Sequence, residues 1–313
     1  MTIPAAQFGR VAVVFGGVSR ERDVSLRSGH AVLEALLDQG INAFAVDGGQ
    51  ALISAVKDGM VDRVFNILHG GEGENGALAG AMEVLGISMT GCGVAGAAIS
   101  MDKVRSKVLV AAAGVQVPPG WAVNARNRAE KLEEIARSGT GPWIVKPSCE
   151  GSSVGLYQAD NRDALQAAID AVLEISPVAL VEKYIAGQEA TVAIVNGTVL
   201  PVVRIQPAAG LYDYAAKYHS QTTIYHCPSG FDALTDAALQ TDAQVAFGAL
   251  GLRGWARIDF IVDAQGRRWF LEANTTPGMT ETSLVPKAAK AHGWSFRRLV
   301  REILATSLEE DDE

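Results

Sequence analysis

Residues 257–274 read RIDFIVDAQGRRWFLEAN, the pattern of two short β-strands joined by a turn. Successive side chains of a strand point to opposite faces. One face of the first strand therefore carries Arg257, Asp259, Ile261 and Asp263, and one face of the return strand carries Arg268, Phe270, Glu272 and Asn274. A two-residue loop of Gln265 and Gly266 suits a primed hairpin turn. This loop pairs Ala264 with Arg267, Ile261 with Phe270, Asp259 with Glu272 and Arg257 with Asn274.

The hairpin brings two acidic side chains together. As direct cross-strand neighbours, Asp259 and Glu272 have Cβ atoms ~4.5–5.5 Å apart. Two ionised carboxylates at ~4 Å repel by roughly 4 kcal/mol when the effective dielectric constant is near 20, and a divalent cation removes that cost. Carboxylate oxygens and the Asn274 amide suit Mg²⁺, which commonly also binds phosphate oxygens. The alternative is a solvated polar hairpin face, although the apolar residues between the two acids make full exposure less favourable.

Two glycine-rich stretches are candidates for ligand loops. The chain has no G-x-x-x-x-G-K-[ST] run, which excludes a P-loop NTPase at the level of motifs. Residues 150–155, EGSSVG, lie between predicted strands at 143–146 and 154–158, and their backbone N–H groups could form an anion nest beside Lys146. A plain turn is the alternative.

The second glycine-rich stretch, HGGEGENG at 69–76, follows a predicted strand and precedes a helical pattern at 77–85. Ligands bind at the carboxyl ends of strands in open α/β sheets. A permissive turn that closes a strand–helix connection is the favoured interpretation when this stretch is taken alone.

The first hundred residues alternate strand and helix. RVAVVFGG at 10–17 is typical of a buried parallel strand that ends in two glycines, and an apolar stripe predicts a helix over 25–39. Further strands are predicted at 42–46 and 61–68, with a short helix at 51–57 between them. This alternation indicates a doubly wound parallel sheet in a unit that ends near residue 100.

Two further units follow in the sequence. The second has predicted helices at 103–113 and 163–173 and predicted strands at 143–146, 154–158 and 178–184. The third begins near Gly187, with predicted strands at 190–195 and 199–205, an irregular segment at 206–230, a helix at 235–250, the hairpin, and a closing helix at 296–307. The fold class is therefore α/β, with an α+β character after the first unit.

Composition excludes several classes of protein. Of 313 residues, 48% are hydrophobic and 20% are charged, as in a globular chain with a sizeable core. The net charge of −8, from 27 basic and 35 acidic residues, argues against a nucleic-acid or anionic-membrane partner. Cys92, Cys149 and Cys227 make neither a disulfide framework nor a zinc site. No secretory signal or sufficiently apolar membrane span is visible, so a cytoplasmic location is expected.

Eight blocks in order carry a family resemblance. They are GGVSRERDVS (16–25), HGGEGENGALAG (69–80), MDKVRSK (101–107), IVKPSCEGSSVG (144–155), EKYIAGQE (182–189), YDYAAKYHS (212–220), ARIDF (256–260) and LEANTTPGMTETSLVP (271–286). From about residue 10 to about residue 305, the chain resembles the D-alanine–D-alanine ligases of the ATP-grasp superfamily. The resemblance implies an N-terminal α/β substrate domain (1–100), a central ATP-grasp lid domain (101–186) and a C-terminal ATP-grasp domain with the Mg²⁺-binding hairpin (187–313), with ATP between the last two.

The resemblance also implies roles for residues toward metal and nucleotide. Two Mg²⁺ ions, with Mn²⁺ as a substitute, would be bound by Asp259, Glu272 and Asn274. Lys103, Lys146 and Lys217 would contact ATP phosphates under a lid that contains Ser152 and Ser153. The adenine and hinge segment would be lined by Glu182, Lys183 and Ile185, and Glu189 would bind the ribose hydroxyls.

At the substrate pocket, the resemblance implies a hydrogen-bonded trio of Glu21, Ser152 and Tyr218. Glu21 would bind the ammonium of the first D-alanine, near His69. Arg257 and the Gly278 backbone would stabilise negative charge that develops at the acyl centre. Ser283 and Leu284 would receive the carboxylate of the second D-alanine.

The implied reaction phosphorylates the first D-alanine with ATP to an acyl phosphate, which the amine of the second D-alanine attacks. D-alanyl-D-alanine for peptidoglycan precursor synthesis is the product, and the family suggests a homodimer. One alternative is a ligase with D-lactate or D-serine as second substrate, against which Tyr218 argues. The other is a nucleotide-binding module without catalysis, against which the full set of charged residues argues.

Overall fold

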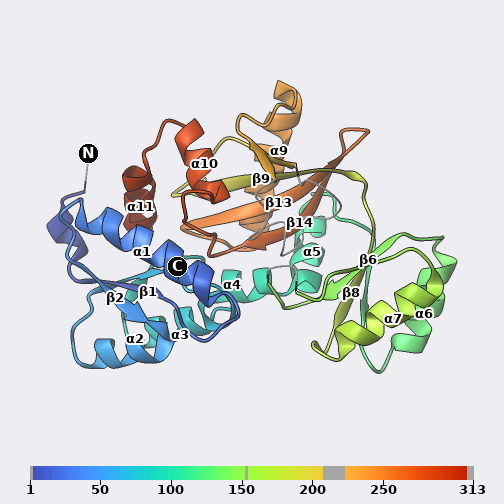
Figure 1. The fold of residues 1–313 in the computed structure, drawn as a ribbon, viewed down its shortest axis with the longest axis horizontal. Coiled ribbons are helices and arrows are strands. Elements are labelled where there is room, and N and C mark those ends of the chain that lie inside the picture. The colour runs from blue at the N-terminus through green and yellow to red at the C-terminus, as the bar shows by residue number, and fades with distance from the viewer. Residues whose placement is uncertain (1–2, 152–153, 207–222, 309–313) are drawn as a thin grey trace.

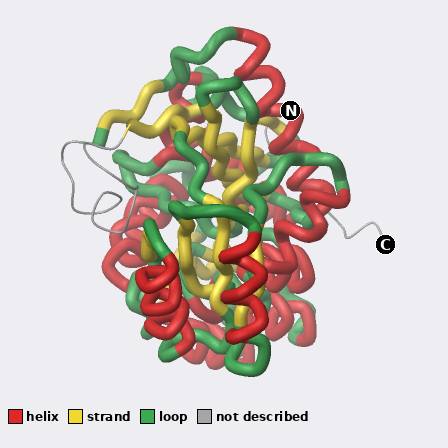
Figure 2. The backbone as a smooth tube through the Cα atoms, turned by 90° about the vertical axis from the view of Figure 1, so that its right-hand side faces the viewer, coloured by secondary structure: helices red, strands yellow, loops and turns green. Residues whose placement is uncertain are grey.

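The computed structural model describes residues 3–151, 154–206 and 223–308. Strands in these ranges form three sheets, here called A, B and C. Sheets A and B lie at opposite ends of the molecule, with sheet C between them (Figure 1). Helices line the outer sides of the strands (Figure 2). Within the described ranges, no helix combines the length and apolar character needed to cross a bilayer.

Sheet A is wholly parallel, in the order β2-β1-β3-β4. Its strands are β1 (Val11–Phe15), β2 (Ala43–Asp47), β3 (Arg63–Asn66) and β4 (Ser88–Met89). Alternate β1 side chains pack on opposite sides, with Val13 toward α1 (Arg22–Leu37) and Val14 toward the layer of α2 (Gly48–Lys57) and α3 (Ala77–Val84). Helices thus cover both faces, which confirms the predicted doubly wound sheet. The predicted helix at 25–39 begins three residues earlier, at Arg22.

Helix α1 lies very close to β1. A Cβ atom at Gly29 would lie only 2.2 Å from the Phe15 ring, so glycine is needed for this approach. Helix α1 also contacts α11 (Phe296–Ala305). The core beneath sheet A therefore continues into the end of the chain, where Leu299 and Ile303 are fully buried.

Sheet B is antiparallel, in the order β5-β8-β6-β7. Its strands are β5 (Gly120–Val123), β6 (Trp143–Pro147), β7 (Tyr157–Ala159) and β8 (Ala179–Lys183), and it packs against α6 (Arg128–Arg137) and α7 (Arg162–Leu173) around its own core. The strand predicted at 154–158 begins only at Tyr157. The reason is a turn, since Val154 N–H donates to the Gly151 carbonyl and Gly155 has a positive φ of 69°.

Sheet C has the order β12-β11-β9-β13-β14, with β10 beside β9. Its strands are β9 (Gly187–Val195), β10 (Thr198–Val199), β11 (Val203–Gln206), β12 (Ile224–His226), β13 (Trp255–Asp263) and β14 (Arg268–Asn274). One face packs on α4 (Gly93–Met101), α5 (Lys103–Ala112) and α9 (Ala233–Ala249), and the other on α10 (Leu284–Ala291) and α11. Helix α5, placed in the second unit by sequence, thus packs on the sheet of the third.

The β13–β14 hairpin confirms two predicted pairs, Asp259 with Glu272 and Arg257 with Asn274. The two-residue loop and the Ile261–Phe270 pair were wrong. Asp263 N–H donates to the Arg267 carbonyl, so the loop has three residues and ends at Gly266, whose φ is 74°. Three-residue hairpin loops commonly place glycine at this left-handed position.

The register error has a physical cause, a β-bulge at Leu271. Phe260 pairs with Phe270 and Asp259 with Glu272, so Leu271 is an extra residue on β14. The bulge puts Phe270 and Ala273 together in the core, although they are three residues apart. Phe270 therefore does not share the face of Glu272, in contrast to the prediction.

Candidate functional site

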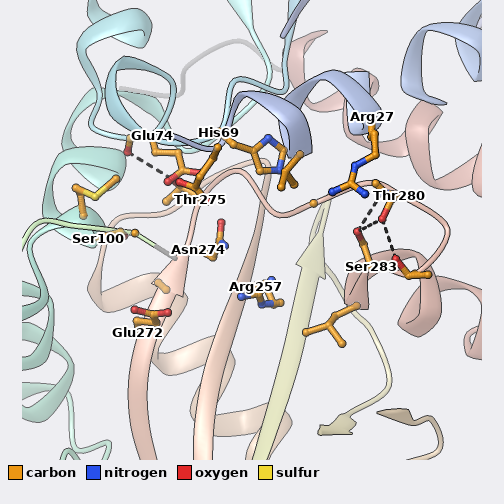
Figure 3. Close-up of a pocket in the computed structure, with 18 of the residues that line it drawn as sticks. Arg27, His69, Glu74, Ser100, Arg257, Glu272, Asn274, Thr275, Thr280 and Ser283 are labelled. Carbon is orange, nitrogen blue, oxygen red and sulfur yellow. Dashed lines mark hydrogen bonds between the residues drawn. The ribbon is translucent and has the colours of Figure 1, made fainter. Parts of the chain in front are cut away.

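Two adjoining pockets lie where the three sheets meet. The first, here called the polar pocket, is lined by residues that include Glu21, His69, Arg257, Asn274, Gly278 and Ser283. The second, here called the inter-sheet pocket, lies between sheets B and C and is lined by residues that include Lys146, Glu182, Ile185, Glu189 and Asp259. Lys103 and Glu272 line both. In the polar pocket, Arg257, Glu272 and Asn274 project from strands toward His69 and Glu74 on the opposite wall (Figure 3).

The candidate metal ligands are held by basic and hydroxyl side chains. Arg257 donates from Nε to Asp259 Oδ1 (2.9 Å) and from Nη2 to Asp259 Oδ2 (2.8 Å). Thr191 Oγ1 donates to the same Oδ1 at 2.6 Å. The Lys103 Nζ lies 3.2 Å from Glu272 Oε2. Each of the two adjacent carboxylates is thus neutralised by a basic side chain of the protein. A hard metal ion could take the place of that basic side chain.

The donor chemistry of this group fits Mg²⁺. Asp259 and Glu272 supply carboxylate oxygens and Asn274 supplies an amide oxygen, which are the ligands that a hard divalent cation prefers. The described part of the chain has no group of three or more His, Cys, Asp and Glu side chains arranged for a metal. Asp259, Glu272 and Asn274 comprise only two such side chains and one amide, and their metal-binding role stays a prediction.

A buried ionic cluster forms one wall of the inter-sheet pocket. Lys146 Nζ lies 2.8 Å from Glu182 Oε2, and Lys107 Nζ lies 2.8 Å from Glu182 Oε1. Burial would lower the pKa of Lys146, but Glu182 and Glu272 raise it overall. Burial likewise would raise the pKa of Glu182, but the two lysines lower it. Glu182 is thus an ionised carboxylate shared by two lysines.

The structure brings together the other described residues predicted for nucleotide. Lys183, Ile185 and Glu189 line the inter-sheet pocket with Lys103 and Lys146. The Lys103 ammonium donates to the Glu150 carbonyl at 2.7 Å, at the start of the glycine-rich loop. The Lys183 ammonium donates to the Ser138 carbonyl at 3.3 Å. Their contacts to a nucleotide remain predictions.

His69 is buried against the polar pocket. Its Nδ1 lies 2.9 Å from the Ile67 carbonyl, so Nδ1 carries the proton and Nε2 is an acceptor. Nε2 has no hydrogen-bond partner among the described residues. Burial lowers the pKa of His69, which keeps the imidazole neutral. A neutral acceptor therefore faces the pocket.

Gly278, Ser283 and Leu284 lie together at the start of α10. Ser283 Oγ accepts from the Thr280 N–H at 3.0 Å, and Leu284 is the first residue of α10. A Cβ atom at position 278 would lie 2.9 Å from Ser283 Oγ, so glycine keeps this corner open. A small anionic group could approach backbone N–H groups here.

Four predicted residues, Ser152, Ser153, Lys217 and Tyr218, lie outside the described residues. The trio of Glu21, Ser152 and Tyr218 and the contacts of Lys217 therefore stay predictions. Of that trio, Glu21 lines the polar pocket.

Three ionisable residues at the site were not predicted. Glu74 is buried at the polar pocket, where burial and then the Glu21 charge raise its pKa to about 8. Arg27 extends from α1 toward Thr280 and Ser283 (Figure 3). Lys107 contacts Glu182. Lys107 follows Lys103 by four residues, a spacing that places both on one helix face and could have indicated a shared role.

A parallel α/β sheet followed by two antiparallel sheets that face each other across lysines and carboxylates defines an ATP-grasp protein. A family model described as "D-ala D-ala ligase C-terminus" matches residues 109–305. The chain belongs to the D-alanine–D-alanine ligase family.

Relatives from bacteria support this assignment over nearly the whole chain. D-alanine–D-alanine ligase B of Chromobacterium violaceum is 44% identical over 300 residues, covering 96% of this chain and 98% of the relative. The D-alanine–D-alanine ligase of Nitrosomonas europaea is 46% identical over 302 residues, covering 96% and 98%.

Solved structures agree with the sequence comparison. The VanG D-Ala:D-Ser ligase of Enterococcus faecalis is similar with a TM-score of 0.85, at 29% identity, over 95% of this chain and 99% of that chain. The Bacillus anthracis D-alanine–D-alanine ligase complexed with ATP is similar with a TM-score of 0.81, at 29% identity, over 96% and 97%.

Proposed function

We propose that this protein joins two D-alanine molecules into D-alanyl-D-alanine at the expense of ATP, for peptidoglycan precursor synthesis. The observation that carries the proposal is that the polar pocket and the inter-sheet pocket share Lys103 and Glu272. A nucleotide in one pocket and an amino acid in the other would therefore meet at the candidate metal ligands. Family membership over nearly the full chain supports the same reaction.

At the nucleotide end, Lys103 and Lys146 would bind ATP phosphates, together with Lys217. Glu182, Lys183 and Ile185 would line the adenine and hinge, and Glu189 would bind the ribose. Phosphoryl transfer depends mainly on positioning and on neutralisation of charge, which suits a site built from lysines and metal ligands. Two Mg²⁺ ions on Asp259, Glu272 and Asn274 would supply that neutralisation, and Mn²⁺ would substitute.

At the amino-acid end, Glu21 would bind the ammonium of the first D-alanine, close to His69. A carboxylate oxygen of this first D-alanine attacks the terminal phosphorus of ATP. The bond between that phosphorus and ADP breaks, and an acyl phosphate forms. The neutral amine of the second D-alanine then attacks the acyl carbon, and the tetrahedral intermediate expels phosphate. Arg257 and the Gly278 N–H would stabilise the developing oxyanion, which is typically worth ~3–4 kcal/mol per donor.

Ser283 and Leu284 would hold the carboxylate of the second D-alanine at the start of α10. The acyl phosphate is sensitive to water, and the loop with Ser152 and Ser153 would cover it. Tyr218 acting through Ser152 is one hypothesis for the general base.

We place the reaction in a cytoplasmic homodimer, with domains at 1–100, 101–186 and 187–313.

A second candidate is a ligase that takes D-serine as second substrate, because the VanG D-Ala:D-Ser ligase has the higher TM-score of the two structures. Incubation with ATP, Mg²⁺, D-alanine and an equal amount of D-serine or D-lactate, followed by product mass, separates these activities. We expect D-alanyl-D-alanine to dominate and L-alanine to give no product. A dominant mixed product would favour the second candidate, and absence of D-alanine-dependent phosphate release would overturn both.

A further inference from the structure

Lys107 is a buried charged residue to which the proposed reaction assigns no role. Helix α5 buries Lys103, Ser106, Lys107 and Val110, which lie on one face at helical spacing. The Lys107 side chain is only 6% exposed, although lysines are almost never fully buried unless they are paired. Such a position requires strong local compensation.

The compensation comes from two different sheets. The Lys107 ammonium donates to the Phe270 carbonyl at 2.9 Å and lies 5.5 Å from the centre of the Phe270 ring. It also lies 2.8 Å from Glu182 Oε1. Phe270 belongs to β14 of sheet C and Glu182 to β8 of sheet B. One ammonium group therefore joins the sheet that carries the candidate metal ligands to the sheet that carries Lys146.

The Phe270 carbonyl is available because β14 is the edge strand of sheet C. An edge strand presents N–H and C=O groups that lack a strand partner. The Phe270 N–H donates to the Gln116 carbonyl at 2.8 Å, and the Phe270 carbonyl accepts from Lys107. Lys107 thus binds the edge strand at Phe270, next to the bulge at Leu271 and two residues before Glu272.

In the buried ionic cluster, two lysines share the carboxylate of Glu182. Lys107 and Lys146 contact the same carboxylate, which is 3% exposed, so Glu182 is shared between two ammonium groups, and Glu272 adds a second negative charge nearby. Burial lowers the pKa of Lys107 to about 8 and the repulsion of Lys146 adds to this, while Glu182 and Glu272 act in the opposite direction. Lys107 is charged at neutral pH, so Glu182 is neutralised at both of its oxygens, by Lys107 and by Lys146.

We propose that Lys107 is a positioning residue for ATP, which holds Glu182 against the edge of β14 and leaves the Lys146 ammonium free to bind a phosphate. Without Lys107, Glu182 would be neutralised by Lys146 alone, which would hold the Lys146 ammonium at Glu182 and away from a phosphate. The Lys107 side chain lines neither pocket, so it acts through Glu182. This inference rests on the proposed function, since it assigns phosphate binding to Lys146.

The test is a double-mutant cycle read by nucleotide binding. The Kd for ATP with Mg²⁺, without D-alanine, is measured by calorimetry for the wild type, Lys107→Met, Glu182→Gln and the double variant. We expect Lys107→Met to weaken binding by about tenfold or more, because loss of one partner from a buried ionic group is costly. In the Glu182→Gln background, we expect the same substitution to change the Kd by less than about twofold.

Controls separate positioning from a general loss of structure. Lys57→Met makes the same change at an exposed lysine on α2 and is expected to leave the Kd unchanged. Lys107→Arg keeps the charge and is expected to recover most of the affinity. If Lys107→Met does not fold, the test rests on two other comparisons of the Kd. The first is Lys107→Arg against the wild type, and the second is the double variant against Glu182→Gln.

An unchanged Kd in Lys107→Met, or an equal loss in both backgrounds, would overturn the inference. With D-alanine added, the expected signature is a raised KM for ATP with the KM for D-alanine unchanged. If the wild type binds ATP but releases no phosphate with D-alanine, the proposed function is contradicted. The double-mutant cycle can still be interpreted in that case, because it measures ATP binding alone.

Discussion

Asp259 and Glu272 are direct partners across β13 and β14, yet each carboxylate contacts a different base. Arg257 Nη2 lies 2.8 Å from Asp259 Oδ2, and Lys103 Nζ lies 3.2 Å from Glu272 Oε2. The repulsion expected for two adjacent carboxylates is thereby relieved within the protein. A metal ion at this position must compete with these two basic side chains.

The first prediction concerns the metal carboxylate. Glu272→Gln is expected to abolish phosphate release, because a neutral amide binds Mg²⁺ far more weakly than a carboxylate. Stability should change little, since Lys103 keeps its bond to the Glu150 carbonyl. Steady-state kinetics and thermal unfolding check the two parts. Glu133→Gln, at a half-exposed glutamate on α6, is the matched control, and retained activity in Glu272→Gln would reject the metal assignment.

A second prediction concerns the shape of the cation at position 257. Arg257→Lys keeps the charge but loses the two parallel hydrogen bonds to Asp259. We expect kcat to fall by about 10²–10³, the usual effect of removing one donor to an oxyanion. The KM for ATP should change little, because Arg257 lines the polar pocket and not the inter-sheet pocket. A kcat within a few-fold of the wild type would show that charge alone suffices.

The third prediction concerns pH and Glu74. Its pKa is raised in the folded state to about 8, so between about pH 4.5 and pH 8 the folded chain binds a proton that the unfolded chain has lost. This carboxyl therefore makes the free energy of unfolding decrease as pH rises through that window. Glu74→Gln removes the effect. Urea unfolding with a chelator should show the variant gaining stability relative to wild type from pH 5 to pH 8, and a constant difference would contradict the assignment.

The fourth prediction concerns thiol reactivity. Cys92 is buried, donates from Sγ to the Trp255 carbonyl at 3.2 Å, and has its pKa raised to about 12 by burial. Cys149 is exposed beside the glycine-rich loop. Maleimide should label Cys149 in the folded protein and Cys92 only after denaturation, because the thiolate must be formed and accessible. Mass spectrometry locates the adducts, and Cys149→Ser is the control.

Labelling also reports on the nucleotide. Cys149 lies three residues after Lys146, so bound ATP with Mg²⁺ is expected to slow the reaction of Cys149. Equal rates with and without ATP would place the nucleotide away from this loop.

Much of the fold was predictable from hydrophobic pattern. The strand VAVVF was predicted because a parallel strand buried on both faces is apolar throughout. The helix that follows it was predicted from its apolar stripe. Helix α10 was missed because Pro286 interrupts its pattern, although proline is tolerated in a first helical turn. Helix α4 was missed because its sequence, GVAGAAISM, has no polar face to give a period.

Only part of the candidate site was predictable from the sequence. The pairing of Asp259 with Glu272 survives the register error, because the bulge at Leu271 adds one residue and the longer loop compensates for it. The bulge itself depends on Phe270 and Ala273 both reaching the core, which strict alternation forbids. Glu74 and Lys107 were missed because only tertiary packing shows that these two ionisable side chains are buried.

The contact between α1 and α11 has a consequence for synthesis on the ribosome. Residues 296–305 cover an apolar surface of α1, and Gln39 donates to the Arg297 carbonyl across that contact. Domains generally fold as units while the chain emerges, N-terminal parts first. Helix α1 therefore cannot complete this contact until residues 296–305 have been added. A nascent chain that stops before residue 296 would leave that apolar surface open to chaperones.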